Sequence, residues 1–342
     1  MLELILPIAA ILAGFVMLVW GADRFVLGAA GCAKGFGVSP LVIGLTIVGF
    51  GTSAPELLVS SLAALEGAPG MSVGNALGSN ITNVALVLGI ATIVRPLTVH
   101  RKVMAIDTPI LLGVMGLTML LLLDGDLNRL DGGLLLGGLF LMIGLVVRQG
   151  IKEKAEPEGL EDLPEDMTTK RALVWLATGL AVLLVGAKIL VDGAVFVAEY
   201  AGVESSVIGL TVVAFGTSLP ELAATVVAAR RNEHDIAVGN IIGSNLFNTL
   251  GVLGLPGLIH PGPVEESVLT RDGPVMMGVL ALFWLLALAP KRGRVGRLGG
   301  LLLCLAFAAH VGWIATETLA DRSANAAQTE QTEQTEPAEV SP

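Results

Sequence analysis

The chain has 342 residues, of which 54% are hydrophobic and 15% charged, and its mean hydropathy is +0.79. This composition is too apolar for an ordinary soluble domain, in which about a quarter of the residues are charged, and indicates a polytopic membrane protein. Aromatic residues make up only 4%, whereas glycine occurs 43 times. Small residues let transmembrane helices approach closely, so an all-α membrane fold is expected.

Ten apolar segments near the length that crosses a bilayer, about 17 to 25 residues, follow one another along the chain. The first five cover residues 4–20, 38–65, 73–94, 103–123 and 130–147. The last five cover residues 172–191, 207–229, 236–259, 273–288 and 298–319. We therefore expect ten transmembrane helices. The first is expected to be retained, since it lacks the basic leader and the cleavage site of a signal peptide.

Polar segments divide these helices into two halves. Residues 1–149 form a first five-helix half, and residues 150–170 form an acidic cytoplasmic linker. Residues 171–319 form the second half, and the low-complexity acidic tail, residues 320–342, is expected to be disordered. Cys32 and Cys304 lie in or beside apolar segments, where a cysteine is usually a small buried residue without a metal or redox role.

Lys and Arg gather in alternate loops, which sets the orientation under the positive-inside rule. One side has sixteen of them: Arg24, Lys34, Arg95, Arg101, Lys102, Arg148, Lys152, Lys154, Lys170, Arg171, Arg230, Arg231, Lys291, Arg292, Arg294 and Arg297. The other side has only Arg129, Arg271 and Arg322, and Lys188 lies inside the sixth segment. We therefore expect a multi-pass protein of the cell (inner or plasma) membrane with both termini extracytoplasmic.

The stretch GFGTSAPE at residues 49–56 recurs as AFGTSLPE at residues 214–221. An offset of 165 aligns residues 21–89 with residues 186–254 without a gap, and 33 of these 69 positions are identical. The offset contains five spans, an odd number, so the second copy enters the membrane from the opposite side. Inverted repeats with Gly- and Pro-interrupted helices are typical of transporters whose site lies near the bilayer midplane.

Each copy places one glutamate, Glu56 or Glu221, inside an apolar segment just after a proline. Proline disrupts the helix before it, and neighbouring Gly, Thr and Ser re-satisfy the freed carbonyls or turn them toward a cavity. A carboxylate at mid-membrane costs about 2.5 to 3.5 kcal/mol, and such residues normally mark an ion path. The structural alternative is burial against Lys188 or Arg24, but one base cannot neutralise two acids.

A second motif, GNxxGSNxxN, also occurs in both copies. It contributes Asn75, Ser79, Asn80 and Asn83, matched by Asn240, Ser244, Asn245 and Asn248. Ser79 and Asn83 lie on one helix face, with Asn75 a further turn back. Ordinary polar contact between helices remains an alternative for Asn75 and Asn80.

These groups are hard oxygen donors. Besides the two carboxylates, they comprise the amide oxygens, exposed carbonyls and the hydroxyls of Thr52, Ser53, Thr217, Ser218, Ser79 and Ser244. Such donors suit Ca²⁺, Na⁺ or protons and argue against zinc or copper. No cofactor is expected. An empty site with two ionised glutamates is costly, so the inward–outward switch should require a compensating cation and produce obligatory counter-transport.

The paired GTSxPE and GNxxGSNxxN motifs resemble the two alpha repeats of the cation/calcium exchanger superfamily, specifically its prokaryotic sodium/calcium exchanger branch. The resemblance implies a calcium/sodium antiporter with ten helices in two inverted five-helix halves and broken helices at the midplane. The second, third, seventh and eighth spans would form the ion site, and the long first and sixth helices would slide across this core. Matched by position, the implied ligands are Glu56, Glu221, Thr52, Ser53, Thr217, Ser218, Ser79, Ser244, Asn83, Asn248 and the carbonyls of Gly49 and Ala214.

One position departs from this pattern: some sodium-coupled relatives have an aspartate where this chain has Asn248. Coupling to protons instead of sodium therefore stays open. A passive channel is a weaker alternative, because a neutral-solute pore does not need two central carboxylates. An enzyme is not expected, since no nucleophile, His set or nucleotide loop accompanies the acids. Membrane lipid is the expected partner, without nucleic acid or an obligate protein partner.

Overall fold

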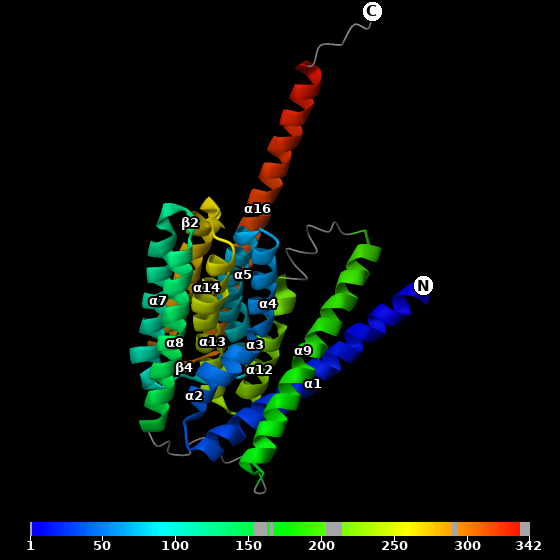
Figure 1. The fold of residues 1–342 in the computed structure, drawn as a ribbon. Helices are drawn as coiled ribbons and strands as arrows, with labels where there is room; N and C mark the ends of the chain where they lie inside the picture. The colour runs from blue at the N-terminus through cyan, green and yellow to red at the C-terminus, as the bar shows by residue number, and fades with distance from the viewer. Residues whose placement is uncertain (1, 153–162, 165–166, 203–213, 289–292, 336–342) are drawn as a thin grey trace, which may run out of the picture.

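Helices make up nearly all of the computed structural model, which describes residues 2–152, 163–164, 167–202, 214–288 and 293–335 (Figure 1). Eight helices in these residues are long and apolar enough to cross a membrane. A ninth span is a bent pair, Pro40–Thr52 and Ala54–Leu65, whose two parts differ in direction by 45°. The expected span at residues 207–229 lies partly outside the described residues, so the count of ten stays a prediction.

Two of the spans form the centre of the bundle. In the most apolar stretch of His234–Ile259 all residues are buried, and in that of Pro69–Val94 72% are buried, against 17% to 33% in the other six spans. The central elements are α5 (Pro69–Ile81), η2 (Thr82–Val87), α6 (Leu88–Val94), α13 (His234–Phe247), η6 (Asn248–Val252) and α14 (Gly254–Ile259). These segments carry the two GNxxGSNxxN motifs.

Broken helices pack against this centre. The first copy contributes α2 (Pro40–Ile43), the π-helical η1 (Gly44–Val48), α3 (Gly49–Thr52) and α4 (Ala54–Leu65); the second contributes α11 (Ala214–Thr217) and α12 (Leu219–Arg230). Glycines bring the elements together. A Cβ on Gly243 of α13 would lie 2.5 Å from the Leu45 carbonyl oxygen, and one on Gly49 would lie 2.8 Å from the Ser244 nitrogen. Larger side chains would separate α13 from η1 and α3.

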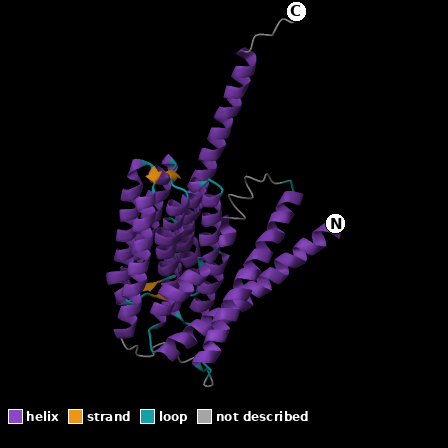
Figure 2. Cartoon of the chain, viewed as in Figure 1, coloured by secondary structure: helices purple, strands orange, loops and turns teal. Residues whose placement is uncertain are grey.

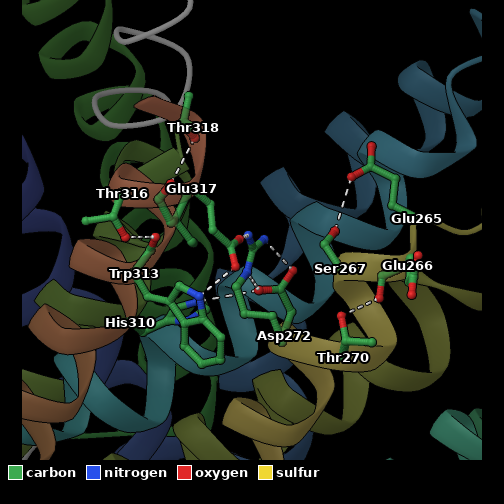
Figure 3. A network of polar contacts seen from close by, with 12 residues as sticks. Glu265, Glu266, Ser267, Thr270, Asp272, His310, Trp313, Thr316, Glu317 and Thr318 are labelled. Atoms are coloured by element: carbon green, nitrogen blue, oxygen red, sulfur yellow. Dashed lines mark hydrogen bonds and ion pairs between the residues drawn. The ribbon is translucent and has the colours of Figure 1, made fainter. Parts of the chain in front are cut away.

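The outer elements are η3 (Val103–Asp107), α7 (Thr108–Leu121), η4 (Leu122–Asp124), α8 (Arg129–Lys152), η7 (Val268–Asp272), α15 (Gly273–Leu288) and α16 (Arg297–Thr335). Figure 3 shows the polar contacts between α16 and η7. The Arg271 guanidinium donates to Asp272 (2.8 and 3.0 Å) and to Glu317 (2.5 Å), and the Trp313 indole also donates to Glu317. His310 Nε2 lies 3.7 Å from Asp272.

The last helix, α16, continues to Thr335. It thus extends into the segment 320–342, for which the polar, low-complexity sequence predicts disorder, and residues 336–342 lie outside the described residues. The segment after 319 is rich in Ala, Gln and Glu, which have high helix propensities and can extend an established helix. In Figure 1 this part of α16 projects well beyond the bundle.

The long helices α1 (Leu2–Phe36) and α9 (Thr169–Tyr200) lie side by side along one flank of the bundle (Figure 1). Glycines spaced by seven residues line their contact: Gly14, Gly21 and Gly28 on α1, with Gly179, Gly186 and Gly193 on α9. A Cβ on any of the six would overlap atoms of the facing helix, including its backbone. The smooth, closely packed contact is the kind that small residues permit between transmembrane helices.

The first and sixth predicted spans, 4–20 and 172–191, are too short. Arg24 was expected in a loop after the first span, but it lies within α1, where its guanidinium stacks over Trp20 (5.7 Å) and Trp175 (4.8 Å). The neighbouring Asp23 pairs with Arg231 at the end of α12. Because these contacts stabilise the charges, the helix does not end where the apolar stretch does.

Matching elements recur in the two halves at the sequence offset of 165. The π-helical turns η3 and η7 are separated by this offset, as are the strands β1 (Leu97–Thr98) and β3 (Gly262–Pro263). Each two-stranded sheet joins one strand from each half. β1 pairs antiparallel with β4 (Arg294–Val295), and β2 (Asp126–Leu127) pairs antiparallel with β3. The two sheets lie toward opposite ends of the bundle (Figure 2).

Candidate ion-binding site

Both GTSxPE motifs interrupt their helices at the serine. Ser53 separates α3 from α4 with φ −81° and ψ 5°, and Ser218 separates α11 from α12 with φ −86° and ψ 4°. In each copy the proline then occupies the first turn of the new helix, where its missing N–H has no intrahelical partner to lose. The predicted break is therefore confirmed in both copies, and each glutamate falls in the first turn, near the positive end of the helix dipole.

Glu56 and Glu221 are both fully buried. Ser53 Oγ donates a hydrogen bond to Glu221 Oε1 over 3.2 Å and so links the two copies. The other oxygen of Glu221 and both carboxylate oxygens of Glu56 have no hydrogen-bonding partner within hydrogen-bond geometry among the described residues. Thr217 lies close enough to the Glu56 carboxylate to interact with it, and the two carboxylates interact with each other. Buried acceptors left in this state are the ligands that a cation requires.

The Thr52 hydroxyl stands at the contact between α3 and α13. It lies 3.0 Å from Asn240 Oδ1 and 3.2 Å from Ser244 Oγ, and it also reaches the Gly49 carbonyl at 3.4 Å. Ser244 Oγ in turn donates to the same carbonyl over 3.3 Å. The predicted ligands Thr52 and Gly49 from the first copy and Ser244 from the second therefore lie together.

Asn75 and Asn240 make equivalent contacts in the two halves. Asn75 Nδ2 donates to Ser60 Oγ over 2.9 Å and to the carbonyl of Glu56 over 3.1 Å. Asn240 Nδ2 donates over 2.9 Å to the hydroxyl of Thr225, the residue aligned with Ser60. These bonds hold each glutamate-bearing helix against its neighbour, so Asn75 makes the polar interhelical contact that the sequence left open.

Three of the remaining four asparagines, Asn80, Asn83 and Asn245, take part in bonds between the halves. Asn80 Nδ2 donates to Thr249 Oγ1 over 2.9 Å, and Asn83 Nδ2 donates to Asn245 Oδ1 over 3.2 Å. The amide oxygens of Asn80 and Asn83, the Asn245 nitrogen and both side-chain atoms of Asn248 are buried and without a partner in the described residues. Asn248 begins the π-helical turn η6 and Asn83 lies in η2. Such turns are frequent at functional sites.

Three predicted ligands have less local detail. Ser79 is buried on α5, 4% exposed, and the Ser218 hydroxyl is buried without a partner among the described residues. Ala214 is the first residue of α11 and its side chain lies outside the described part of the chain. The sequence did not single out Ser60, Thr225 and Thr249. For Ser60 and Thr225 a signal existed, because a hydroxyl follows the glutamate by four residues in both copies.

The two bases considered as partners of the glutamates are engaged elsewhere. Lys188 Nζ pairs with Asp192 at 3.0 Å on the exposed side of α9, and Arg24 stacks on the two tryptophans described above. Within the described residues no group of three or more His, Cys, Asp and Glu gathers as a metal cluster. The site thus combines two buried acids with neutral oxygen donors.

A cavity of about 500 Å³ reaches this site from the side of α8. Its walls are apolar, with Phe50 and Phe247 in ring contact at 5.4 Å, and Ser53 is among the lining residues. Ser53, whose hydroxyl bonds Glu221, therefore connects the cavity with one of the two acids.

The fold is that of a multi-span membrane protein with buried oxygen donors at its centre. The family model described as sodium/calcium exchanger protein matches residues 6–148 and 171–315. CaxA of Alkalimonas amylolytica is 44% identical over 304 residues, which cover 87% of this chain and 95% of that protein. The sodium/calcium exchanger MaX1 of Methanosarcina acetivorans is 33% identical over 310 residues, which cover 79% and 87%.

The solved structure of the sodium-calcium exchanger NCX_Mj superposes with a TM-score of 0.79 at 35% identity, covering 90% of this chain and 98% of that one. This chain belongs to the sodium/calcium exchanger family, in its prokaryotic branch. The family is one of membrane-embedded cation antiporters, not of enzymes, and the resemblance of the paired motifs is confirmed.

Proposed function

We propose that this chain exchanges Ca²⁺ for Na⁺ by alternating access at the site formed by Glu56 and Glu221. The observation that carries the proposal is the pair of fully buried carboxylates, three of whose four oxygens lack a hydrogen bond within the described residues. Two carboxylates match the charge of Ca²⁺, and the surrounding hydroxyls and amide oxygens supply hard ligands. The relative NCX_Mj was soaked with Na⁺ together with Sr²⁺ or Ca²⁺.

Coupling follows from charge. With both acids ionised and no ion bound, the site is strongly destabilised in a low dielectric, so the passage between inward- and outward-open states is suppressed until a cation compensates it. Ca²⁺ and Na⁺ can each compensate this negative charge. The site therefore does not switch between the two states while it holds no cation. The proposed movement is a sliding of α1 and α9 over the core, and their close glycine-lined contact with each other suits movement as one unit.

The recurrence of η3 and β1 in the second half at the offset of 165 supports two inverted five-helix repeats. The excess of Lys and Arg on one side supports extracytoplasmic termini in a cell membrane. A proton-coupled antiporter is the second candidate. It is favoured by Asn248, a neutral residue with both side-chain atoms unpartnered in the described part of the chain, because a missing acid leaves less charge for Na⁺ to balance.

The test is Ca²⁺ uptake by proteoliposomes containing the purified chain, driven separately by an outward Na⁺ gradient and by a pH gradient. We expect Na⁺-driven uptake that Glu221→Gln abolishes. Uptake driven only by the pH gradient would replace sodium with protons as the coupling ion. No coupled uptake with either gradient would show that Ca²⁺ is not the substrate.

A further inference from the structure

A basic pocket lies where β1 pairs with β4, and neither of the two buried glutamates lines it. Its volume is about 420 Å³, and it is lined by Arg95, Pro96, Thr98, Asn232, His234 and Arg294. Glu221 and Arg231 are ten residues apart along α12 and its C-cap, and Arg231 directly precedes the pocket residue Asn232. Ten helical residues span about 15 Å. The exchange mechanism leaves this pocket without a role.

The backbone fixes the two arginines on either side of the pocket. Arg95 ends α6, and its Nη1 donates to the carbonyl of Arg230 at the end of α12 over 3.2 Å. Arg294 lies opposite Thr98 in the β1–β4 pair. The next backbone bond of this pair runs from the Val99 N–H to the Gly293 carbonyl, with 2.6 Å between nitrogen and oxygen. Three separate segments of the chain thereby bring Arg95 and Arg294 to the lining of one pocket.

No carboxylate in the described residues pairs with either arginine. Two acids flank His234 in the chain: Asp235 lies 3.6 Å from His100 Nε2, and Glu233 is buried beside Arg231, where both line a separate cavity. The pocket therefore has an excess of positive charge. Because like charges close together repel each other, an anion that neutralised them would bind favourably.

One further residue points to a ligand. His234 Nδ1 is buried without a hydrogen-bonding partner in the described part of the chain. Asn232 has φ 64°, the left-handed conformation that closes the C-terminus of α12, where glycine or asparagine is usual. It turns the chain between α12 and α13 so that both residues line the pocket.

We propose that this pocket binds a phosphate group. Arginines recognise phosphate through paired, charge-assisted hydrogen bonds, and Asn232, Thr98 and His234 add neutral polar groups. The shared chemistry is that of an anionic phospholipid headgroup or of free phosphate. The pocket adjoins the ends of the membrane spans α6 and α16 on the side rich in Lys and Arg, where basic pockets between helices meet lipid headgroups.

A bound phosphate would connect the two halves. Arg95 belongs to the first half, whereas the α12–α13 turn and Arg294 belong to the second. Since α12 and α13 also carry Glu221 and Ser244, the phosphate group is expected to stabilise the arrangement of the helices that form the ion site.

The test uses the purified full chain, stripped of lipid in neutral detergent, and follows its melting temperature during titration with phosphatidylglycerol, phosphatidylcholine or inorganic phosphate. Phosphatidylglycerol should raise the melting temperature and phosphatidylcholine should not. Each of Arg95→Gln and Arg294→Gln should raise the half-maximal phosphatidylglycerol concentration roughly fivefold, as expected for about 1 kcal/mol per arginine. Arg148→Gln, an exposed arginine on α8, is the matched control and should leave it unchanged.

Arg294→Gln keeps the experiment decisive if Arg95→Gln fails to fold, because the Arg294 side chain makes no hydrogen bond in the described residues. A rise produced by inorganic phosphate that also depends on Arg294 would support the phosphate site and assign it a soluble anion. A phosphatidylglycerol effect equal in wild type, Arg294→Gln and Arg148→Gln would overturn the proposal, as would the absence of any effect of either anion on the wild type.

Discussion

Ser53 and Glu221 are 168 residues apart in the chain, yet the hydroxyl of the first donates to the carboxylate of the second over 3.2 Å. Ser53 marks the break between α3 and α4 in one copy of the repeat, and Glu221 opens α12 in the other. The bond therefore connects the broken helix of one copy directly to that of the other.

Removing one buried charge should stabilise the protein while abolishing transport. Glu56→Gln and Glu221→Gln each replace a buried carboxylate that has no neutralising base by a neutral amide. In cation-free buffer both variants should melt at a higher temperature than the wild type. Both should lose the rise in melting temperature that Ca²⁺ produces by binding the native state.

Glu266→Gln is the control for these variants, because Glu266 is exposed and remote from the site. It should change neither the melting temperature nor the response to Ca²⁺. A lower melting temperature for both site variants in the absence of cations would contradict the view that the empty site is under electrostatic strain.

Ser53→Ala removes a hydroxyl that both supports Glu221 and is a proposed ligand. A hydrogen bond to a charged group contributes about 1.5 to 3 kcal/mol, so the Ca²⁺ dissociation constant measured by calorimetry should rise by roughly tenfold or more. Ser61→Ala removes a hydroxyl that bonds the Leu57 carbonyl within α4, at 2.6 Å, and should leave the constant unchanged. Equal affinities in the two variants would remove Ser53 from the site.

Gly243→Ala should disturb the contact between α13 and η1. The added Cβ would lie 2.5 Å from the Leu45 carbonyl oxygen and 2.9 Å from its Cα, and such overpacking typically costs about 1 to 3 kcal/mol. The melting temperature should fall. Gly144→Ala on α8, where a Cβ meets nothing within 4 Å, should be neutral or slightly stabilising, since alanine favours helix. A neutral Gly243→Ala would mean that the two elements can move apart freely.

Asn248→Asp adds a third acid to a buried site. More negative charge requires more compensating cations, so the Hill coefficient for Na⁺ in Na⁺-driven Ca²⁺ uptake should increase. Asn128→Asp provides the control, because Asn128 lies at the start of α8, where its Oδ1 accepts from two backbone N–H groups as a carboxylate also could. Active transport with an unchanged Na⁺ coefficient in Asn248→Asp would show that this position does not set the coupling.

The sequence predicted the broken helices and the glutamates within them because both depend on local features that occur twice, a proline and a buried acid. It also placed Thr52, Ser53 and Ser244 at one site, since repeat symmetry brings matched motifs together. The lengths of α1 and α9 were not predictable from hydropathy. Arg24 was expected beyond the end of the first span, but Arg24 and the neighbouring Asp23 find distant partners, Trp175 and Arg231, and the helix continues.

The pairing of individual polar atoms was likewise beyond the sequence. Asn75 and Asn83 occupy similar places in the same motif, but Asn75 bonds Ser60 within its own half, whereas Asn83 bonds Asn245 of the other. Which of these bonds forms depends on how closely the glycines allow the helices to pack, a tertiary property that the spacing of the motif does not contain.

The most direct measurement of the central claim is a calorimetric titration of the purified protein with Ca²⁺, with and without Na⁺. We predict that one Ca²⁺ binds per chain, that Na⁺ weakens this binding competitively, and that binding is lost in both Glu56→Gln and Glu221→Gln. Ca²⁺ binding that survives with unchanged affinity in both variants would contradict a shared site built on these two carboxylates.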